Sequence, residues 1–270
     1  MTSSIDLISS ASNPLIKMLR GLDRKKVRSE TGLFLAEGGR LLEQALVQGW
    51  DIETVIVSNS GLERPMTQEL ISRAAKAGAR IARVPDQLAS TIARKDNPQA
   101  VLGAIRQRKL SLDQLDPSAS GLWLGLHEIR DPGNLGTILR TADCAGLAGV
   151  ILIGTCCDPF SVEAVRASMG SIFDIPLARS DFDTFDRWRQ TGALALVAAS
   201  VNGSVAHTDV DFTQPYLILM GTEQSGLPDE VEAKCDTRCI IPMRGGADSL
   251  NLAQASAIMV YEAWRQRGFA

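Results

Sequence analysis

Three segments place polar side chains and glycines directly after stretches whose pattern predicts buried strands. They are NLGTILR from Asn134 to Arg140, GTEQSGLPDE from Gly221 to Glu230, and IIPMRGGADSLNLAQASA from Ile240 to Ala257. Ligands of open α/β sheets bind at the carboxyl ends of the strands, so side chains from separate segments can meet there. We therefore take these three segments as the candidates for chemistry.

Each segment taken alone has an ordinary structural explanation. Asn134 is a plausible helix N-cap, and Ser249 or Asp248 could cap the helix that follows the third segment. Arg140 could simply pair with an acid, and Glu223 lies in a glycine-bracketed turn, where a carboxylate is usually solvated. The three segments in combination are more specific than any one of them.

Strand and helix patterns alternate along the chain, which predicts an α/β fold. The first helix is expected to begin at Asn13-Pro14, an N-cap followed by proline, and to end before Thr31-Gly32. Near-continuous apolar strands such as VILI and LILM are typical of a parallel sheet buried on both faces. The predicted strands are 33–37, 54–58, 79–84, 100–105, 122–127, 149–154, 171–177, 193–199, 216–221 and 238–243, and the further predicted helices are 39–48, 65–78, 86–93, 135–146, 161–169, 182–190, 228–235 and 249–267.

A polar stretch with Pro, Ser and Gly, residues 107–121, is the best linker candidate, and it divides the chain into domains at 1–106 and 122–270. The charge is divided in the same way. Residues 1–110 hold 17 Lys and Arg against 11 Asp and Glu, a net charge of +6, and residues 111–270 hold 11 against 20, a net charge of −9. A basic front half favours contact with a polyanion, although a solvated helix face without a partner gives the same pattern.

Composition excludes several classes of protein. The chain has 45% hydrophobic and 22% charged residues, a composition typical of globular proteins. It contains no apolar run of about 18 residues, the length that a membrane-spanning helix needs. The opening residues lack the basic-then-apolar order of a secretion signal. Five cysteines without a CxxC motif are expected to be reduced thiols of a cytoplasmic protein, and two histidines make a metal site improbable.

The order and spacing of the three segments resemble the SpoU/TrmH class of RNA 2'-O-ribose methyltransferases, which belongs to the SPOUT superfamily. That class shows Asn-x-Gly-x-x-x-Arg, Gly-x-Glu-x-x-Gly and Ile-Pro-Met followed by Ser-Leu-Asn, and this sequence has all three motifs. The segment VRASMGSIFDIP, residues 165–176, is similar to the one that these enzymes carry between the first two motifs. Residues 9–46 are similar to the substrate-binding domain of many members, a small α/β fold resembling ribosomal protein L30e.

The resemblance implies a role for each motif residue. Arg140 would act on the ribose hydroxyl, as a base or by polarising it, and the second reading is physically easier because arginine is hard to deprotonate. Asn134 would orient Arg140 or the ribose, Glu223 would accept hydrogen bonds, and Ser249 and Asn251 would shape the pocket. S-adenosylmethionine would be held by backbone groups of Gly221, Ile241 and Leu250, in loops 198–200, 221–226 and 241–250.

The resemblance also implies a knotted parallel sheet, a trefoil knot, in the second domain and a homodimer with its active site built across the two copies. Composition and periodicity alone would not predict a knot. RNA phosphates would be contacted by Lys25, Lys26 and Arg166, although Arg166 could instead form a surface salt bridge. Folded RNA loops would be the target, with ribosomal RNA favoured over transfer RNA.

Two other functions fit parts of the sequence. A catalytically silent RNA-binding protein could keep the fold, but the full set of motif residues disfavours this alternative. A dinucleotide-dependent oxidoreductase would need Gly-x-Gly-x-x-Gly between its first strand and helix, and the stretch DPGNLGTILR lacks it.

Overall fold

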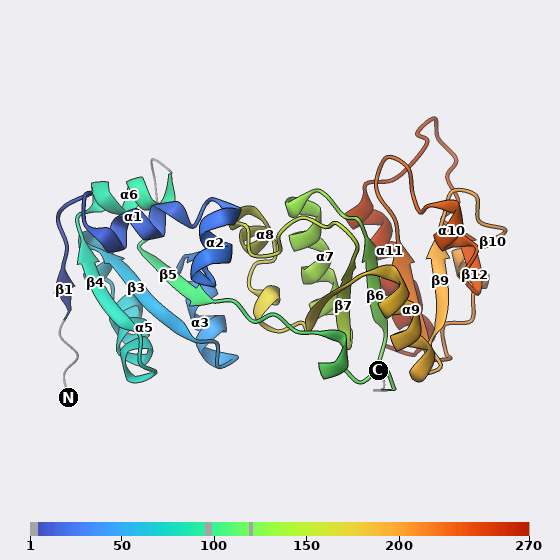
Figure 1. The fold of residues 1–270 in the computed structure, drawn as a ribbon, viewed down its shortest axis with the longest axis horizontal. Helices are drawn as coiled ribbons and strands as arrows, with labels where there is room; N and C mark the ends of the chain where they lie inside the picture. Colours follow the sequence, from blue (N-terminus) through green and yellow to red (C-terminus); the bar gives the residue numbers. More distant parts are fainter. Residues whose placement is uncertain (1–4, 95–98, 119–120, 270) are drawn as a thin grey trace. The chain divides into compact units, whose positions relative to one another are not determined.

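The computed structural model describes residues 5–94, 99–118 and 121–269 of the chain, which form two compact units (Figure 1). Unit 1 contains Met1–Arg108 together with Asp158–Phe173, and unit 2 contains Lys109–Cys157 and Asp174–Ala270. The segment 158–173 falls inside the second domain of the sequence-based division, but in the structure it packs with the first 108 residues. Residues 158–173 thus belong to the core of unit 1, although the residues on both sides of them in the sequence belong to unit 2.

Unit 1 is built on a five-stranded sheet with the order β1-β4-β3-β5-β2. Strands β1, β4 and β3 are parallel to one another, and β5 runs antiparallel to both β3 and β2. The strands are β1 (Asp6–Leu7), β2 (Leu33–Glu37), β3 (Ile52–Ser58), β4 (Arg80–Val84) and β5 (Val101–Arg106). Every predicted strand of this half is present, and the two-residue β1 is an addition.

Helices cover both faces of this sheet, with α1 and α6 on one side and α3 and α5 on the other (Figure 1). The helices of the first 108 residues are α1 (Pro14–Gly21), α2 (Lys25–Thr31), α3 (Gly39–Val47), α4 (Asn59–Leu62), α5 (Pro65–Lys76) and α6 (Asp86–Ala93). Ile16 and Leu19 of α1 pack with Leu88 and Ile92 of α6 against the strands. Apolar residues at helical spacing therefore form this core, as the sequence pattern predicts.

The single helix predicted from residue 14 to residue 30 is wrong, because the chain forms two helices there. The Asn13 side chain caps α1 by accepting from the Leu15 backbone N–H, with Pro14 in the first turn, as predicted. The helix then stops, and the buried Arg28 donates Nη1–H bonds to the backbone oxygens of Leu22 and Asp23, both at 2.8 Å. The break thus exposes two carbonyl groups that a continuous helix would have used itself.

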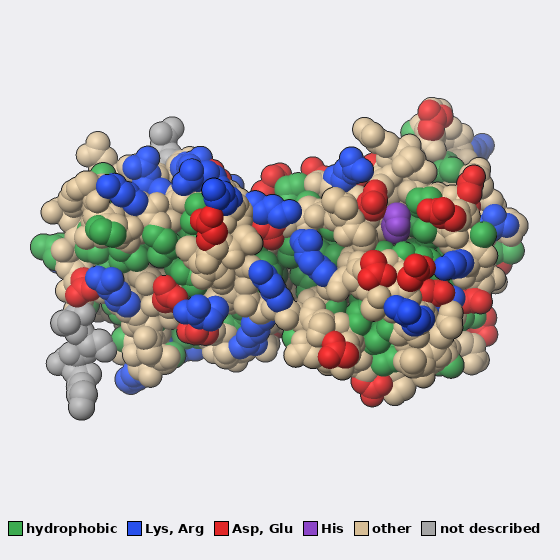
Figure 2. Space-filling model, viewed as in Figure 1, with side chains coloured by type: hydrophobic (Ala, Val, Ile, Leu, Met, Phe, Trp, Pro, Cys, Tyr) green, Lys and Arg blue, Asp and Glu red, His purple; other side chains and the backbone are tan. Residues whose placement is uncertain are grey.

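A basic surface covers this break. The exposed cations of α1, α2 and the end of α6 gather over these helices on the face shown in Figure 2, and they are Lys17, Arg20, Arg24, Lys25, Lys26 and Arg94. Two of them have ion-pair partners, since Lys26 lies 3.9 Å from Glu30 and Arg94 lies 2.6 Å from Asp23. We call these six residues the basic surface of unit 1.

The segment 158–173 is fixed to unit 1 by one buried ion pair and by aromatic packing. Arg28 donates from Nε and Nη2 to Asp158 Oδ2 at 2.9 and 2.7 Å, and its side chain is only 4% exposed. Phe173 packs against Phe34 and Trp50, and the Trp50 indole N–H donates to the Phe173 backbone oxygen at 3.0 Å. Both ends of the segment are therefore tied to the core of unit 1.

Residues 171–177 do not form the predicted strand. Ser171–Phe173 is a single 3₁₀ turn, and β8 begins only at Leu177. Burial of the Phe173 ring and use of its carbonyl by Trp50 hold the backbone in this turn. Tertiary packing here overrides a local apolar pattern that is typical of strands.

Unit 2 contains a seven-stranded, fully parallel sheet with the order β10-β12-β9-β11-β6-β7-β8. The inner strands are buried on both faces, because consecutive residues such as Leu217, Ile218 and Leu219 all have no exposed surface. This confirms the prediction made from the apolar runs. The strands are β6 (Trp123–His127), β7 (Gly149–Ile153), β8 (Leu177–Ser180), β9 (Ala195–Ala199), β10 (Val205–Ala206), β11 (Tyr216–Met220) and β12 (Thr237–Ile240).

Helices α7 and α11 pack against each other, while Phe185 and Trp188 of α9 fill a separate apolar cluster with Trp123 and strand residues. The predicted linker is partly structured, because Leu112 is buried in this cluster and the Trp188 indole N–H donates to Leu115 O at 3.0 Å.

The remaining helices are α7 (Pro132–Cys144), α8 (Val162–Ala167), α9 (Phe182–Thr191), α10 (Asp229–Glu232) and α11 (Leu252–Gln266), with 3₁₀ turns at Leu112–Gln114 and His207–Asp209.

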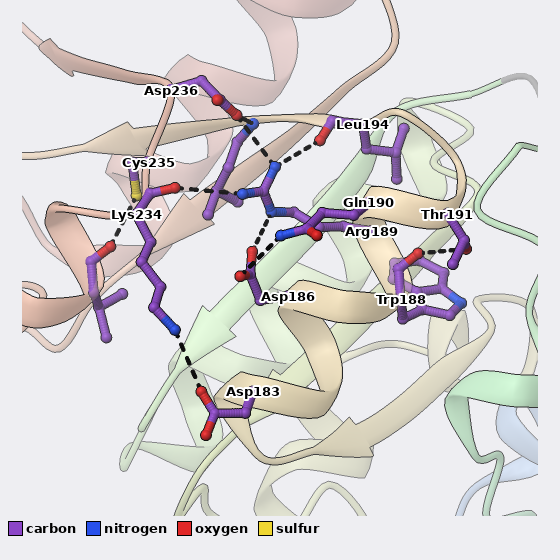
Figure 3. A network of polar contacts seen from close by, with 12 residues as sticks. Asp183, Asp186, Trp188, Arg189, Gln190, Thr191, Leu194, Lys234, Cys235 and Asp236 are labelled. Carbon is purple, nitrogen blue, oxygen red and sulfur yellow. Dashed lines mark hydrogen bonds and ion pairs between the residues drawn. The ribbon is translucent and has the colours of Figure 1, made fainter.

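A polar network around Arg189 anchors two neighbouring strands where they begin (Figure 3). The buried guanidinium donates to Asp186 Oδ1 at 2.7 Å, to the Leu194 backbone oxygen at 3.0 Å and to Asp236 Oδ2 at 3.2 Å. Asp236 Oδ2 in turn accepts from the Leu196 backbone N–H at 2.7 Å. The network therefore joins α9, the start of β9 and the residue that leads into β12.

Within the described ranges no helix is long and apolar enough to cross a membrane. The same residues contain no group of three or more His, Cys, Asp or Glu side chains arranged to hold a metal ion.

Loss of the Asp158 carboxylate is expected to destabilise unit 1 strongly. In Asp158→Ala the Arg28 guanidinium stays buried without its charge partner, so we expect a loss of about 3 kcal/mol in the free energy of unfolding by urea. Glu30→Ala is the matched control, because it removes the exposed partner of Lys26 and should cost at most about 0.5 kcal/mol. Equal losses in the two variants would contradict this assignment.

Candidate active site

Four neighbouring strands deliver their carboxyl-terminal loops to one edge of the sheet in unit 2. Strands β12, β9, β11 and β6 are adjacent in that order and all parallel, so their loops leave on the same side. The second and third motif segments begin at the ends of β11 and β12, and the first lies in α7, which follows β6 after a short loop. The sheet order therefore explains why residues more than 100 positions apart can share a site.

A cavity of about 400 Å³ lies among three of these loops. This volume is in the range of small-molecule sites. Each of the three loop regions that the resemblance assigned to the cofactor contributes to the wall. The lining residues are Ala199, Ser200, Val201, Asn202, Met220, Gly221, Thr222, Glu223, Gln224, Ser225, Gly226, Leu227, Asp229, Glu232, Ile240, Ile241, Met243, Asp248, Ser249, Leu250, Leu252 and Ala255.

The loop after β11 is closed on itself. Backbone hydrogen bonds run both ways between Thr222 and Gly226, at 2.9 and 3.1 Å, and Gly226 has a φ of +66°. A Cβ on Gly221 would lie 2.3 Å from the backbone carbon of Gly226, so no larger residue fits without opening the loop. The two glycines of the motif thus have a structural function, which holds Glu223 at the cavity wall.

The first turn of α7 frees Asn134 for other contacts. The alternative that Asn134 simply caps this helix is wrong, because Asp131 is the N-cap and its Oδ1 accepts from the Asn134 backbone N–H at 2.6 Å. Pro132 occupies the first helical position, where its missing N–H is no loss. Asn134 therefore lies in the first turn of the helix, with both ends of its side-chain amide available.

Asn134 links two other motif residues through that amide. Its Nδ2 donates to Glu223 Oε1 at 2.6 Å, and its Oδ1 accepts from Asn251 Nδ2 at 3.0 Å. Asn251 Oδ1 accepts from the Ala253 backbone N–H at 2.9 Å, which fixes the orientation of its amide and hence that of Asn134. The result is a chain of hydrogen bonds, from Asn251 to Asn134 and from Asn134 to Glu223, that joins all three motifs.

Asn251 is also the N-cap of α11, so the expectation that Ser249 or Asp248 caps this helix is wrong. Ser249 is exposed and lines the cavity instead, together with Leu250 and Ile241 from the same irregular loop. Gly221, Ile241 and Leu250, which the resemblance assigned to cofactor binding, therefore all lie on the cavity wall.

Arg140 lies farther along α7, beyond the hydrogen-bonded chain. Its side chain is exposed, and within the described part of the protein it makes no hydrogen bond or ion pair. The simple alternative of a local acid partner is therefore not realised in this structure. An exposed, unpaired guanidinium can bind an anion or an oxygen with developing negative charge.

The three residues assigned to RNA lie in unit 1. Lys25 and Lys26 are exposed on α2, as part of the basic surface. Arg166 of α8 pairs with Glu37 at 2.8 Å; its side chain is 47% exposed, whereas that of Glu37 is 6% exposed. The salt bridge considered from the sequence is therefore present, and the half-exposed guanidinium still faces solvent.

Acidic side chains dominate the electrostatics of the cavity. Its lining includes Glu223, Asp229, Glu232 and Asp248, and no Lys, Arg or His among the described residues. Nearby thiols stay protonated at neutral pH, because burial raises the pKa of Cys235 to about 12 and that of Cys239 to about 11. Nucleophilic thiol catalysis is therefore excluded for these two residues.

His127, at the end of β6, is a poor base candidate. It is buried against Phe182, with ring centroids 6.4 Å apart, and does not line the cavity. Burial lowers its pKa, and the nearby Glu128 and Glu230 offset this only in part. The imidazole is thus neutral at pH 7 and packs as an aromatic ring.

Sequence reasoning missed two groups of site residues. Asp229 and Glu232 line the cavity from α10. Asp229 lies within the second candidate segment but was given no role, and Glu232 lies outside all three segments. Asp131 was missed as the N-cap, although an acid followed by proline at a helix start is itself an N-cap signal.

Comparison with known proteins matches this architecture in both parts. Residues 121–261 match the model of the SpoU rRNA Methylase family, and residues 13–103 match that of the MRM3-like substrate binding domain. A crystal structure of an S-adenosylmethionine-bound rRNA methyltransferase from Sinorhizobium meliloti has 42% sequence identity and a TM-score of 0.90, covering 97% of this chain and 98% of the other.

Two curated relatives span most of this chain. A 23S rRNA (uridine(2479)-2'-O)-methyltransferase from Streptomyces viridochromogenes is 32% identical over 91% of this chain and 87% of its own length. The 23S rRNA (guanosine(2553)-2'-O)-methyltransferase RlmP of Bacillus subtilis is 30% identical over 94% of this chain and 97% of its own. The chain belongs to the SpoU rRNA methylase family.

Replacing Asn134 with aspartate tests the hydrogen-bonded chain. Asn134→Asp turns the 2.6 Å donor contact with Glu223 into a contact between two carboxylates. We expect a loss of about 1–2 kcal/mol in unfolding free energy at pH 8, which disappears below about pH 4 as a proton bridges the pair. Stability relative to the wild type thus falls as pH rises, and urea unfolding at both pH values measures it. A pH-independent loss would contradict the contact.

Proposed function

We propose that this protein transfers a methyl group from S-adenosylmethionine to a ribose 2'-hydroxyl of ribosomal RNA. The observation that carries the proposal is the series of hydrogen bonds Asn251–Asn134–Glu223, which joins residues of three separate motifs. Glu223 lies in the wall of the cavity, and the other two residues are bonded to it directly or through Asn134. The relatives from Streptomyces viridochromogenes and Bacillus subtilis are named as 23S rRNA 2'-O-methyltransferases, which supports the same reaction and RNA class here.

The cavity fits the donor chemically. Apolar side chains such as Leu227, Ile240 and Leu252 suit a purine ring and a thioether chain, and the surrounding carboxylates suit a sulfonium cation. Backbone groups of Gly221, Ile241 and Leu250 would hold the donor, since none of these residues has a polar side chain. When bound, S-adenosylmethionine supplies a methyl group on a positively charged leaving group.

The side chains of the site then orient the acceptor. Arg140 would stabilise negative charge as it develops on the ribose oxygen, because its exposed guanidinium is free to meet a substrate. Asn134 and Glu223 are locked to each other, so they would position the ribose rather than move a proton. Ser249, which is exposed at the cavity wall, would contact the sugar, and Asn251 fixes the orientation of the Asn134 amide.

The alternatives fit the site less well. A dinucleotide carries phosphates, which four carboxylates without a lining cation would repel, so an oxidoreductase is disfavoured. RNA binding without catalysis would not require hydrogen-bonded motif residues beside an acidic cavity large enough for S-adenosylmethionine, so a catalytically silent RNA-binding protein is also disfavoured. Transfer RNA stays the second candidate substrate, and the basic surface of unit 1 would bind either RNA by the same phosphate contacts.

Unit 1 would bind the RNA. Its basic surface, with Lys25 and Lys26 exposed on α2, is suited to phosphate contacts, and Arg166 adds a half-exposed guanidinium on α8. We accordingly propose residues 1–106 as the RNA-binding domain, joined by residues 107–121 to a methyltransferase domain at 122–270, with segment 158–173 packed in unit 1.

Three further properties follow from the family resemblance and belong to this proposal. The parallel sheet of unit 2 would contain a trefoil knot. Two copies of the chain would form a homodimer with an active site built across both, and the protein would act in the cytoplasm, where its RNA substrate is found.

Removal of Arg140 tests the catalytic assignment. Arg140→Ala should lower kcat at least about 100-fold in a tritiated methyl-transfer assay on ribosomal RNA, because charge stabilisation of this kind contributes about 3 kcal/mol. Donor affinity measured by calorimetry should not change, since Arg140 does not line the cavity. Arg187→Ala removes an exposed arginine of α9 as the control and should keep full activity. Full activity of Arg140→Ala would remove its assigned role.

RNA binding should depend steeply on salt. Lys25→Gln combined with Lys26→Gln should weaken binding at low salt and reduce the slope of log K against log salt concentration by about 2, because each substitution removes one cation that neutralises a phosphate. Lys76→Gln is the matched control, because this exposed lysine ends α5 on the opposite face of the sheet from α1 and α6. Equal slopes for both sets of variants would place the RNA elsewhere.

A further inference from the structure

The side chain of Asn134 can join Glu223 to Asn251 only because another residue caps α7. An asparagine near a helix start usually accepts a backbone N–H with its oxygen. Here the Asn134 oxygen accepts from Asn251 Nδ2 at 3.0 Å instead. The capping function is taken by Asp131, three residues earlier, whose Oδ1 accepts from the backbone N–H of Asn134 itself at 2.6 Å.

We propose that Asp131 is a positioning residue for methyl transfer, which acts by fixing the first turn of α7 and leaving the Asn134 amide free. This inference rests on the proposed function. Asp131 is exposed at the helix start and does not line the cavity. It influences the reaction through Asn134 and makes no contact with the donor pocket.

The geometry explains why the cap matters for catalysis more than for folding. Without an N-cap the first turn of a helix frays, and the fraying does not extend far beyond that turn. Asn134 lies in that turn, whereas Arg140 lies well inside α7. Loss of the cap would therefore loosen the contacts from Asn134 to Glu223 and Asn251 while Arg140 keeps its place.

The backbone before the cap leaves little freedom to compensate. Glu128, which follows β6, adopts a φ of +52°, a conformation that favours glycine, and its N–H donates to Ile153 O at 2.9 Å. Pro132 fixes its own φ directly after the cap. The loop from β6 to α7 is thus restricted at both ends, and the Asp131 side chain adds to the backbone bond from Leu135 N–H to Asp131 O in joining it to the helix.

Unit 2 offers a matched control at α9. Asp181 is the N-cap of that helix, and its Oδ1 accepts from the Thr184 backbone N–H at 2.8 Å, three residues along, as in α7. It is also exposed and does not line the cavity. Asp181→Ala therefore removes an equivalent cap without affecting the motif residues.

The experiment compares Asp131→Ala, Asp131→Ser and Asp181→Ala in the full-length protein. Asp131→Ala should lower kcat about fivefold to tenfold, with the KM for S-adenosylmethionine unchanged. Asp131→Ser should recover most of the rate, because a serine hydroxyl also caps a helix. Asp181→Ala should lower the melting temperature at least as much as Asp131→Ala does, and keep kcat within about twofold of the wild type.

A second readout does not require turnover. The side-chain amide signals of Asn134 and Asn251 in a ¹⁵N-correlated NMR spectrum should shift in Asp131→Ala and keep their wild-type positions in Asp181→Ala. Unshifted signals, or a kcat loss no larger than that of Asp181→Ala, would overturn the inference. So would an Asp131→Ser variant as slow as Asp131→Ala, since the charge rather than the cap would then matter. A wild-type protein without methyl transfer would refute the proposed function, and the NMR comparison would still test the cap.

Discussion

The site depends on the small number of hydrogen bonds that one side-chain amide can make in fixed directions. Asn134 donates at 2.6 Å to a carboxylate from the loop after β11 and accepts at 3.0 Å from an amide at the start of α11. Each bond fixes the orientation of the next, back to the backbone N–H groups of α11. Three loops that share no local sequence therefore become one rigid unit, and a shift of any one of them would break the chain.

The sheet makes this convergence possible. Strands β12, β9, β11 and β6 are neighbours, and their inner residues have almost no exposed surface, so their carboxyl ends cannot move independently. The Arg189 network holds the opposite ends of β9 and β12, because its guanidinium bonds to Asp186, Asp236 and a backbone carbonyl (Figure 3). The rigid part of unit 2 is thus the parallel sheet, and the candidate site residues lie in segments that leave this sheet on one side.

The sequence patterns predict most of the elements because their physical causes are local. Apolar periodicity locates most of the strands, and the Asn13-Pro14 signal locates the start of α1. The misses have tertiary causes. The break after α1 is stabilised by Arg28, and the turn at 171–173 is stabilised by Trp50, a residue more than 120 positions away. Arg28 is close in sequence to the carbonyls that it binds, but it is buried by its ion pair with Asp158, 130 positions away. Neither long-range contact can be identified from a window of neighbouring residues, so the continuous helix and the strand at 171–177 are both wrong predictions.

The candidate site shows the same limit more sharply. The motifs led to Asn134, Glu223 and Asn251 as a group, and the ordinary structural alternative for Asn134, capping of the helix, is a local function that Asp131 performs. The positions of Asp229 and Glu232 on the cavity wall follow only from the fold, which places α10 against the cavity. Which residues belong together could be predicted from the resemblance, whereas which bond each one makes required the three-dimensional arrangement.

The division of charge between the two halves of the chain has a physical consequence for the reaction. The donor is a cation and the acceptor is a polyanion, and one surface cannot attract both equally. The cavity in unit 2 is acidic, whereas the exposed cations gather on α1, α2 and α6 of unit 1 (Figure 2). Under the proposed function, unit 1 would therefore supply most of the binding energy for RNA. Under the same proposal Arg140, which has no hydrogen-bond or ion-pair partner among the described residues, would meet the ribose–phosphate segment with a positive charge.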